Sequence, residues 1–481
     1  MKKSLAEIVK SKYNNKSQIK TIEMSCGKFD LTIFYIESIT DKKLFSAAIL
    51  APLNEYLKNT QLTIKEIKDD LQNNIFSIYS VEKSNDETQV LKKILSGNVA
   101  VVVGDIAFLV PIFSAEKRSI DEPPTSRVIK GPREGFVEEL FANTGLVRKR
   151  LKTPNLQIEN LIVGKQTNTE ISVFYLNGIA KEDIVEGVIS KLKTIDVDGV
   201  IDSYYVETFI TENKIKFFRR VGNTEKPDIF CAKLLEGRVG IIVDGSPIAL
   251  TVPFVFLEDL QASQDYFTIK SMATFARIMR LVGLFFAILA PGIYVAMQSF
   301  NYRIFPINFL ISILASIEGL SIPPLVEVLI VLFLFEIITE ASMQMPNSLG
   351  IALSIIGALA LGNTAVDAGI ISPPSIVIVA ISSVAIYIIP DEIPEARILR
   401  VLFTAMGGII GLYGIMVSLI ILTSYMSSIE SYGIPYFEPM APSIKLDKKD
   451  GLIKQDLNQM KLRPHFFASK NKTRQSKRGG V

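Results

Sequence analysis

The first 270 residues of the chain contain a pattern of apolar and polar positions that occurs twice. Residues 31–36 form an apolar run typical of a strand, and a helix-like stretch follows over 41–57. The same order returns 140 residues further on, with a strand-like run over 171–176 and a helix-like stretch over 181–192. Strands followed by amphipathic helices usually pack as helices on a sheet. The pattern therefore predicts two α/β subdomains of similar topology.

A second pair of segments repeats at the same spacing. Residues 94–103 align with residues 234–243, again at an offset of 140. Each copy then passes through a turn of Gly and Asp into another apolar run that ends in Val-Pro. Strand, tight turn and strand in this order are typical of a β-hairpin. We therefore expect each subdomain to contain a short sheet covered by helices.

A turn-rich connector joins the two copies. Residues 122–125 and 131–136 contain Pro, which restricts the backbone angles, and Gly, which allows a larger range of them. Acidic and basic side chains are interleaved with them. An anion could bind at the start of the helix that follows. Because Glu134 would repel an anion, a salt-bridged docking turn is favoured. The residues that we expect to make subdomain or assembly contacts are Glu122, Arg127, Arg133 and Glu134.

A helix is predicted from Glu134 to Leu151, directly after the connector. It carries acids in its first turn and Arg148-Lys149-Arg150 in its last, which matches the direction of the helix macrodipole. Gly145 weakens this helix.

From Leu281 onward the chain is strongly apolar. The chain is 48% hydrophobic overall, and only three Arg and no Lys occur between Leu281 and Tyr425. Such a stretch indicates a polytopic, all-α membrane domain. Its apolar runs are 281–299, 324–339, 349–371, 375–389 and 401–425, with a weaker run over 306–322.

Basic residues indicate how this domain is oriented. Arg277 and Arg280 precede the first apolar run, and residues 443–481 contain 11 Lys/Arg and 3 Asp, a net charge of +8. Both ends should therefore lie on the cytosolic side, which requires an even number of crossings. Four to six crossings are possible, and four are favoured because 375–389 is short and 349–371 is interrupted by polar residues.

These observations divide the chain into five parts. The expected parts are a first α/β subdomain (1–120), a connector and helix (121–151), a second α/β subdomain (152–270), a transmembrane domain (271–428) and a basic cytoplasmic tail (429–481).

Composition excludes several classes of chemistry. Two cysteines and one histidine cannot provide a disulfide framework, a His-based triad or most zinc sites. No phosphate-binding or dinucleotide-binding glycine motif occurs. The basic tail lacks the interleaved aromatics of a base-stacking surface. We therefore expect no enzyme, no cofactor, no metal and no nucleic acid partner, and we expect membrane lipid as a partner.

Acids in the apolar half are the main candidates for function. A charge inside a bilayer is costly and usually faces a cavity or a partner. An interfacial position is favoured for Glu318 and Glu340, and a polar pathway or an intersubunit contact for Glu327 and Asp367. In a ring of subunits such acids would attract cations. The candidate ion-pathway residues are Glu327, Glu336, Asn363 and Asp367.

Proline and glycine suggest structural roles in the same half. Pro323-Pro324 and Pro373-Pro374 each precede an apolar run, and first-turn positions are favoured over hinges. Gly407 and Gly411 form a Gly-xxx-Gly pair that suits close helix packing.

Several longer motifs resemble the A-subunit family of spore germinant receptors (the GerA type). Lys130 and Lys226 stand where that family usually has Arg, and an Arg usual within residues 342–344 is missing. The motifs that carry the resemblance are Glu122 to Thr125, Val128 to Phe136, Thr224 to Asp228, Leu235 to Val239, Val243 to Pro247, Leu289 to Ala296, Glu336 to Pro346, Gly350, Ile356 to Ala358 and Ala365 to Ser372.

The resemblance implies a subunit of a nutrient-sensing complex in the inner spore membrane. Its partners would be a transporter-like B subunit, which binds the germinant, and a lipoprotein C subunit. The A subunits would form a homo-oligomer that acts as a gated cation channel. Three alternatives stay open: a non-conducting scaffold or signal transducer, a transporter with a site near Asn363, and a related germination channel outside a nutrient receptor.

Overall fold

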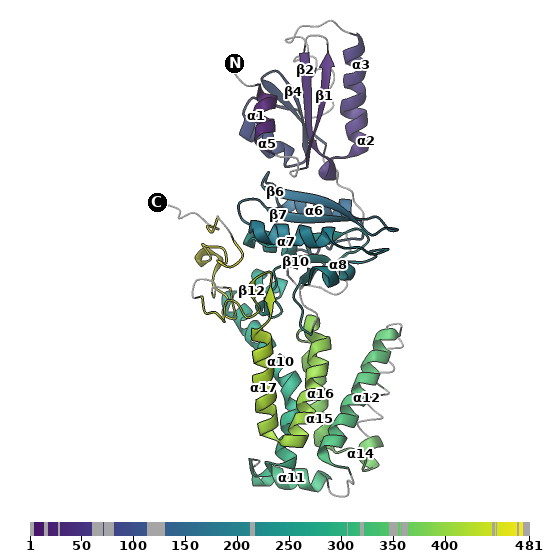
Figure 1. Ribbon diagram of the computed structural model, residues 1–481, viewed down its shortest axis with the longest axis vertical. Coiled ribbons are helices and arrows are strands. Elements are labelled where there is room, and N and C mark those ends of the chain that lie inside the picture. Colours follow the sequence, from purple (N-terminus) through teal and green to yellow (C-terminus); the bar gives the residue numbers. More distant parts are fainter. Residues whose placement is uncertain are drawn as a thin grey trace.

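A computed structural model shows two α/β subdomains stacked on a bundle of helices (Figure 1). The structure describes residues 4–13, 18–26, 29–59, 71, 81–112, 130–211, 217–304, 306–317, 322–345, 355, 357, 364–444, 448, 450–468 and 471–474.

The first subdomain is an antiparallel sheet with strand order β1-β2-β4-β5-β3. Its apolar side chains form one cluster on each face of the sheet. Its elements are α1 (Leu5–Ser11), β1 (Ile19–Cys26), β2 (Phe29–Ile36), α2 (Lys42–Phe45), α3 (Ala51–Asn59), β3 (Glu82–Ser84), α5 (Glu87–Ile94), β4 (Asn98–Val103) and β5 (Ile106–Pro111).

The second subdomain has the corresponding strand order, β6-β7-β9-β10-β8. Helix α7 covers one face of this sheet, and α6 and α9 cover the other. Its elements are α6 (Leu140–Arg150), β6 (Leu156–Val163), β7 (Thr169–Leu176), α7 (Glu182–Lys193), α8 (Ser203–Ile210), β8 (Gly222–Thr224), α9 (Pro227–Glu236), β9 (Val239–Val243) and β10 (Ala249–Val252).

Strand pairing preserves the sequence repeat residue by residue. Leu31 pairs with Val103 between β2 and β4, and Ile171 pairs with Val243 between β7 and β9. Both members of the second pair lie 140 positions after their counterparts. The 140-residue repeat therefore corresponds to one sheet repeated, with the same register in its central strands.

The helix after the connector is shorter than its sequence pattern predicts. It was expected to begin at Glu134, but α6 begins at Leu140. The Asn143 side chain accepts a hydrogen bond from Val137 N at 2.8 Å and donates one to Val137 O at 2.5 Å. These bonds satisfy the backbone of an extended segment before the helix.

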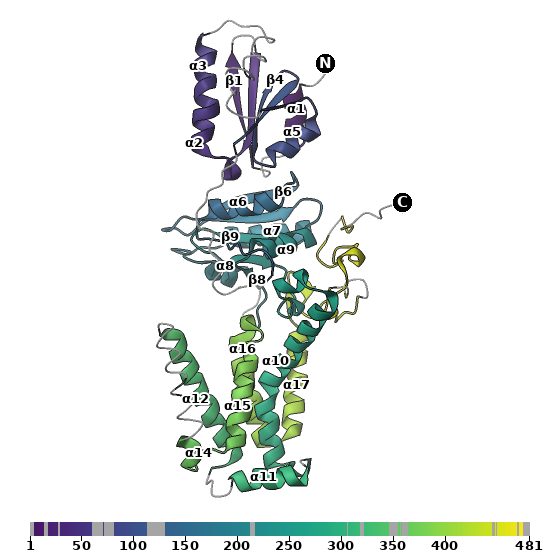
Figure 2. The same ribbon diagram turned by 180° about the vertical axis from the view of Figure 1, so that it is seen from behind.

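The C-terminal half is largely helical, and most of its long helices run along the long axis of the molecule (Figures 1 and 2). Helix α10 leads away from the α/β region, and α11 lies at the far end of the bundle. The helices are α10 (Lys270–Ser299), α11 (Ile307–Ile317), α12 (Pro324–Gln344), α14 (Ala365–Asp367), α15 (Pro373–Ile386), α16 (Ile393–Ile410) and α17 (Leu412–Ser427).

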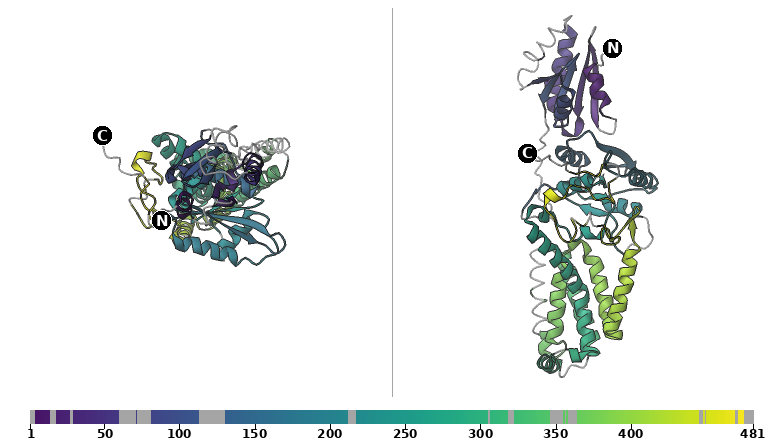
Figure 3. Two further views of the ribbon diagram at one scale, coloured as in Figure 1. Left: turned by 90° about the horizontal axis from the view of Figure 1, so that it is seen from above. Right: turned by 90° about the vertical axis from the view of Figure 1, so that its left-hand side faces the viewer.

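The apolar run over 401–425, expected as one span, is two helices. Helix α16 ends at Ile410 and α17 begins at Leu412, and the two form adjacent arms of the bundle (Figure 3). Gly411 between them has φ 75° and ψ −156°, which is a conformation available essentially to Gly alone. Gly411 therefore serves the reversal of the chain, and a Cβ on it would lie 3.2 Å from Phe300 at the end of α10.

Length and composition identify few clear membrane spans. Among the described residues, one helix, α10 with 30 residues, is long and apolar enough to cross a bilayer. Helices α15 and α17 are apolar but shorter. Pro323 and Pro324 lie at the N-cap and first position of α12, and Pro373 begins α15, as the first-turn interpretation predicts.

The chain after α17, which the sequence predicts to be a basic cytoplasmic tail, packs against the second subdomain. We call the described residues from Ile429 to Arg474 the C-terminal segment. Ile434, Phe466 and Phe467 are buried in the core that covers one face of the second sheet. Because this segment brings apolar side chains to that core, its net positive charge does not keep it in solvent.

Helices α10 and α16 pack closely because Gly292 and Gly407 face each other. A Cβ on Gly407 would lie 2.4 Å from Gly292 O. We expect Gly407→Ala to lower the free energy of unfolding by about 1–3 kcal/mol because the helices must separate. Gly187→Ala, whose Cβ would meet Tyr432 at an ordinary 3.7 Å, should be neutral or stabilising. Thermal unfolding of the purified full chain in detergent measures both, and equal melting temperatures would contradict the expectation.

Candidate functional site

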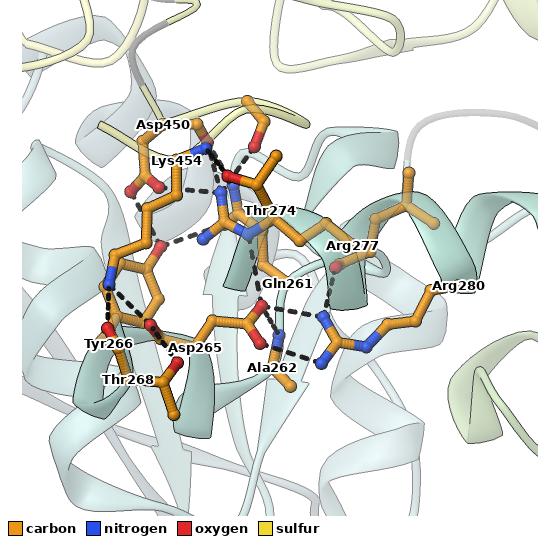
Figure 4. A network of polar contacts seen from close by, with 12 residues as sticks. Gln261, Ala262, Asp265, Tyr266, Thr268, Thr274, Arg277, Arg280, Asp450 and Lys454 are labelled. Atoms are coloured by element: carbon orange, nitrogen blue, oxygen red, sulfur yellow. Dashed lines mark hydrogen bonds and ion pairs between the residues drawn. The ribbon is translucent and has the colours of Figure 1, made fainter. Parts of the chain in front are cut away.

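Three segments from different parts of the chain meet where the α/β region joins the bundle (Figure 4). They are the short helix η6 (Ser263–Phe267), the first turns of α10, and residues 450–454 of the C-terminal segment. We call the five charged residues that connect them the junction network: Asp265, Arg277, Arg280, Asp450 and Lys454.

Asp265 is the centre of the junction network. Arg280 donates two hydrogen bonds to the Asp265 carboxylate, from Nη1 to Oδ2 at 2.8 Å and from Nη2 to Oδ1 at 2.9 Å. Arg277 Nε donates to the same Oδ2 at 3.2 Å, and Ala262 N donates to it at 3.1 Å. Asp265 is 1% exposed, so these bonds form away from bulk water, where charge-assisted pairs are strong.

Arg277 connects Asp265 to the C-terminal segment. Its Nη1 donates to Asp450 Oδ1 at 2.9 Å and to Gly451 O at 2.5 Å. Tyr266 also donates to Asp450, from its hydroxyl to Oδ2 at 2.8 Å. Arg277 is fully buried, so one guanidinium holds two segments that are far apart in sequence.

Lys454 adds a second connection between the same segments. Its Nζ donates to Asp265 O at 2.6 Å, and its backbone N donates to Thr274 Oγ1 at 3.2 Å. Gln261 donates to Asp450 O at 2.6 Å. The C-terminal segment is therefore bonded both to η6 and to the first turns of α10.

The charges of the junction network are nearly balanced. Burial of Asp265 favours its neutral form, but hydrogen bonds and positive charge from Arg280, with Arg277 and the Ala262 N–H, hold its pKa below the ordinary value.

Arg277 and Arg280 are three positions apart and so share one face of α10. The opposite face is apolar and exposed at Met272, Phe275 and Met279.

A path of contacts extends from the network to the connector. Phe136 N donates to Glu225 O at 2.7 Å, next to Lys226. Lys226 Nζ is buried and donates to Ser263 Oγ at 3.1 Å, two residues before Asp265. A displacement of the connector would therefore reach Asp265 through packed and hydrogen-bonded groups.

A second polar cluster lies where the α15–α16 connection meets the second subdomain. Arg219 forms an ion pair with Asp259, which has a fully buried side chain. Glu392, in the short helix η9 (Pro390–Glu392), is 3% exposed. Burial, then the charge of Asp259 and a hydrogen bond with it, raise the pKa of Glu392 well above its ordinary value. The raised pKa favours the neutral form of Glu392 beside the ion pair of Arg219 and Asp259.

A cleft of about 750 Å³ opens between the two subdomains. Its walls include Lys10, Tyr13 and Glu37 of the first subdomain and Asn160 and Glu170 of the second. Its mixed charge would admit a small polar solute.

The connector residues are only partly described. Glu134 forms ion pairs with Lys149, at 3.0 Å, and with Arg150, both on α6. Hydrogen bonds and charge from these cations outweigh the effect of partial burial and lower the pKa of Glu134. These pairs join Glu134 to the helix that follows the connector, and its expected role in subdomain or assembly contacts stays a prediction. Arg133 is described and interacts with the rest of the chain, whereas Glu122 and Arg127 lie outside the described residues.

Glu336, one of the candidate ion-pathway residues, has intrachain cation partners. Arg400 Nη2 lies 2.5 Å from its Oε1, and Arg397 Nε lies 3.2 Å from its Oε2. Arg400 also donates to Ser382 and Ser383 at 3.2 and 2.9 Å. Composition alone missed these pairs because α12 and α16 are distant in sequence.

The other acids of the bundle differ in their surroundings. Glu327 is 2% exposed, and its Oε1 accepts from Ser372 N at 2.7 Å and Ser372 Oγ at 2.6 Å. It therefore caps the start of α15, where a negative charge is favourable. Asp367 on α14 is exposed, and Glu340 is exposed and accepts from Gln344 at 3.2 Å. Asn363 and Glu318 lie outside the described residues.

Sequence reasoning did not identify the junction network. Arg277 and Arg280 were used only as markers of membrane orientation, and Asp265, Asp450 and Lys454 were not singled out. The available signal was two Arg on one face of an apolar helix, which requires buried acidic partners.

Comparisons with known proteins cover nearly the whole chain. Residues 7–466 match a family model described as Bacillus/Clostridium GerA spore germination protein. The chain is 33% identical to Spore germination protein KA of Bacillus subtilis (strain 168) over 484 residues, covering 99% of this chain and 88% of that protein. It is 34% identical to the Uncharacterized membrane protein YfkQ of the same strain, covering 93% and 87%.

Two further similarities concern other species. Spore germination protein GerLA of Bacillus cereus is 30% identical, covering 95% of this chain and 94% of that protein. The crystal structure of the N-terminal domain of the A subunit of the Bacillus megaterium spore germinant receptor GerK3 is 27% identical, covering 52% of this chain and 94% of that chain, with a TM-score of 0.40.

Removing the charge of Asp265 should loosen the C-terminal segment, because Arg277, which holds Asp450, loses its bond to the Asp265 carboxylate. Asp265→Asn leaves Arg277 and Arg280 buried without their shared anion, and we expect a loss of about 3–5 kcal/mol in unfolding free energy. The C-terminal segment should also become rapidly cleavable by trypsin in the full chain. Asp196→Asn removes an exposed pair with Lys165 and should change stability by less than about 1 kcal/mol. Equal cleavage rates in the two variants would contradict the role of the network.

Glu392 should make stability fall as the pH rises. Its pKa is raised in the folded state, so its contribution is complete below the unfolded pKa near 4.5 and decreases as pH rises towards the folded pKa. We expect Glu392→Gln, which stays neutral, to flatten the fall in melting temperature between about pH 5 and 9. The exposed Glu340→Gln should leave the profile as in the parent chain, and a parallel slope for Glu392→Gln would refute this expectation.

Proposed function

The chain belongs to the GerA family of spore germination proteins, and we propose that it is the A subunit of a nutrient germinant receptor. This family consists of receptor subunits and is not a known class of enzymes. The proposed partners are a transporter-like B subunit and a lipoprotein C subunit in the inner spore membrane.

One observation is the main support for this role. The junction network joins the α/β region to the first helix of the bundle. Asp265, Arg277 and Asp450 connect three segments through buried ion pairs. A tilt of the second subdomain would move η6, and η6 could not move without α10 or without breaking buried pairs. In this proposal the network transmits a change in the α/β region to the membrane helices.

The packing of the C-terminal segment supports the proposed topology. Helix α10 begins beside the second subdomain, and the chain after α17 returns to the same subdomain. This packing supports the proposal that both ends of the bundle lie on one side of the membrane, with an even number of crossings between them. With Arg277 and Arg280 at this end, we assign it to the cytosolic side.

We also propose that copies of the chain assemble into a gated cation channel. Asp367 is the exposed acid at the far end of the bundle, where the chain enters α15. Glu327 and Glu336 have partners within the chain, and together with Asn363 they remain candidates for the pathway. A non-conducting signal transducer is the competing function, because the junction network would serve either one.

Ion release from spores distinguishes the two. We expect Asp367→Asn to slow potassium release after nutrient addition, because it removes an exposed negative charge from the pathway. Glu340→Gln, also exposed, is the control and should release potassium at the parent rate. Glu327→Gln and Glu336→Gln test the same pathway, with receptor abundance measured in parallel because both residues have buried partners.

Two results would contradict the proposal that copies of the chain form a cation channel. One is potassium release at the parent rate in all three pathway variants. The other is a purified oligomer that stays impermeable in liposomes under every activating condition, which would favour the signal transducer.

A further inference from the structure

Helix α8 of the second subdomain has an outward face made of aromatic side chains. Tyr204 is 69% exposed, Tyr205 44% and Phe209 42%, and Ile201 just before the helix is 69% exposed. Thr208 completes this face, and its hydroxyl is satisfied by Tyr204 O at 3.0 Å. No charged side chain lies between these positions on the helix surface.

The opposite face of α8 is part of the subdomain core. Ser203, Val206 and Ile210 are buried, and the last two pack with residues of the sheet. The helix is therefore apolar on both faces. Such a helix is normally covered on both sides, because exposed aromatic surface is costly in water.

This exposure is concentrated in one place. Among the described residues from 130 to 260, seven large hydrophobic side chains are exposed, and four of them belong to the segment from Ile201 to Phe209. The other three are Phe141, Ile162 and Leu235, which are scattered over other elements.

Helix α8 lies on the side of the subdomain nearest to the bundle. Tyr432, five residues after the end of α17, donates from its hydroxyl to Ile210 O at 3.1 Å. Phe218, which follows α8 in the chain, packs on Tyr425 in the last turn of α17, with ring centroids 6.0 Å apart. Figures 1 and 2 show α8 at the height of the second subdomain that borders the helices.

We infer that the aromatic face of α8 rests on the lipid headgroup region of the membrane and fixes the orientation of the second subdomain above it. This inference depends on the proposed membrane-spanning bundle. It adds a second attachment beside the junction network, made by a lipid surface.

Dimensions and chemistry both favour lipid as the occupant. Helix α17 has 16 residues and is about 24 Å long, whereas the hydrocarbon core is about 30 Å thick, so the membrane surface lies near or beyond the end of α17. Tyr is enriched at this level because its ring is apolar and its hydroxyl remains wet. The exposed aromatic side chains belong to the helix whose C-terminal end contacts the chain just after α17, close to the level where such a surface is expected.

The chain contains no Trp, so a single substitution places a unique fluorescent reporter. Tyr204→Trp is reconstituted as the full chain in vesicles of phosphatidylcholine and phosphatidylglycerol with brominated acyl chains. We expect a blue-shifted emission that is quenched by the brominated lipid. Ile162→Trp, on edge strand β6 and 67% exposed, is the matched control and should be unquenched. Phe286→Trp on α10 reports on the bundle itself.

Each result has a distinct meaning. If Phe286→Trp is quenched and Tyr204→Trp behaves like Ile162→Trp, the docking inference is wrong and the membrane bundle stands. If Tyr204→Trp is blue-shifted but unquenched, protein covers α8, which also overturns the inference. If Phe286→Trp is unquenched, the proposed membrane domain itself fails. Phe209→Trp repeats the test at a second position, should Tyr204→Trp not fold.

Discussion

Burial of Arg277 and Arg280 at the start of a 30-residue apolar helix is the constraint on which the rest of the structure depends. A guanidinium removed from water without an anion costs several kcal/mol, so each must find acidic partners in the folded chain. Asp265 satisfies both, and Asp450 satisfies the remaining side of Arg277. The α/β region, the first helix of the bundle and the C-terminal segment must therefore fold together at one place.

This constraint explains why the C-terminal segment is not a free tail. Its net charge of +8 over residues 443–481 suggests a segment held in water near anionic lipid. Asp450 and Lys454 instead complete a buried network, and Phe466 and Phe467 enter the core of the second subdomain. A few acidic and apolar side chains decide the position of this segment, and the average composition does not reveal them.

The sequence predicts local and repeated features well and distant pairs poorly. The offset of 140 residues predicted the matching strands, because strand periodicity and hairpin turns are short-range signals. Arg277 and Asp450 are 173 residues apart, and no periodicity links such positions. The turn at Gly411 was not predicted for a related reason, since a packing glycine and a turn glycine look alike without the backbone angles. The partners of Glu327 and Glu336, at the N-cap of α15 and on α16, could not be predicted because they are distant in sequence.

The pairing of Glu336 changes what a cation pathway through this family member requires. Glu336 contributes one negative charge, and Arg397 and Arg400 contribute two positive charges, so the site carries a net charge of +1. A cation passing there would meet repulsion as long as these pairs stay intact. Glu327 is likewise engaged, as the cap of α15. Conduction of cations therefore needs either the exposed acid Asp367, contributed by several copies, or a state in which α12 and α16 separate. If these helices separated, the buried Arg400 and the partly exposed Arg397 would lose Glu336, so the open state must supply new anions or water to them.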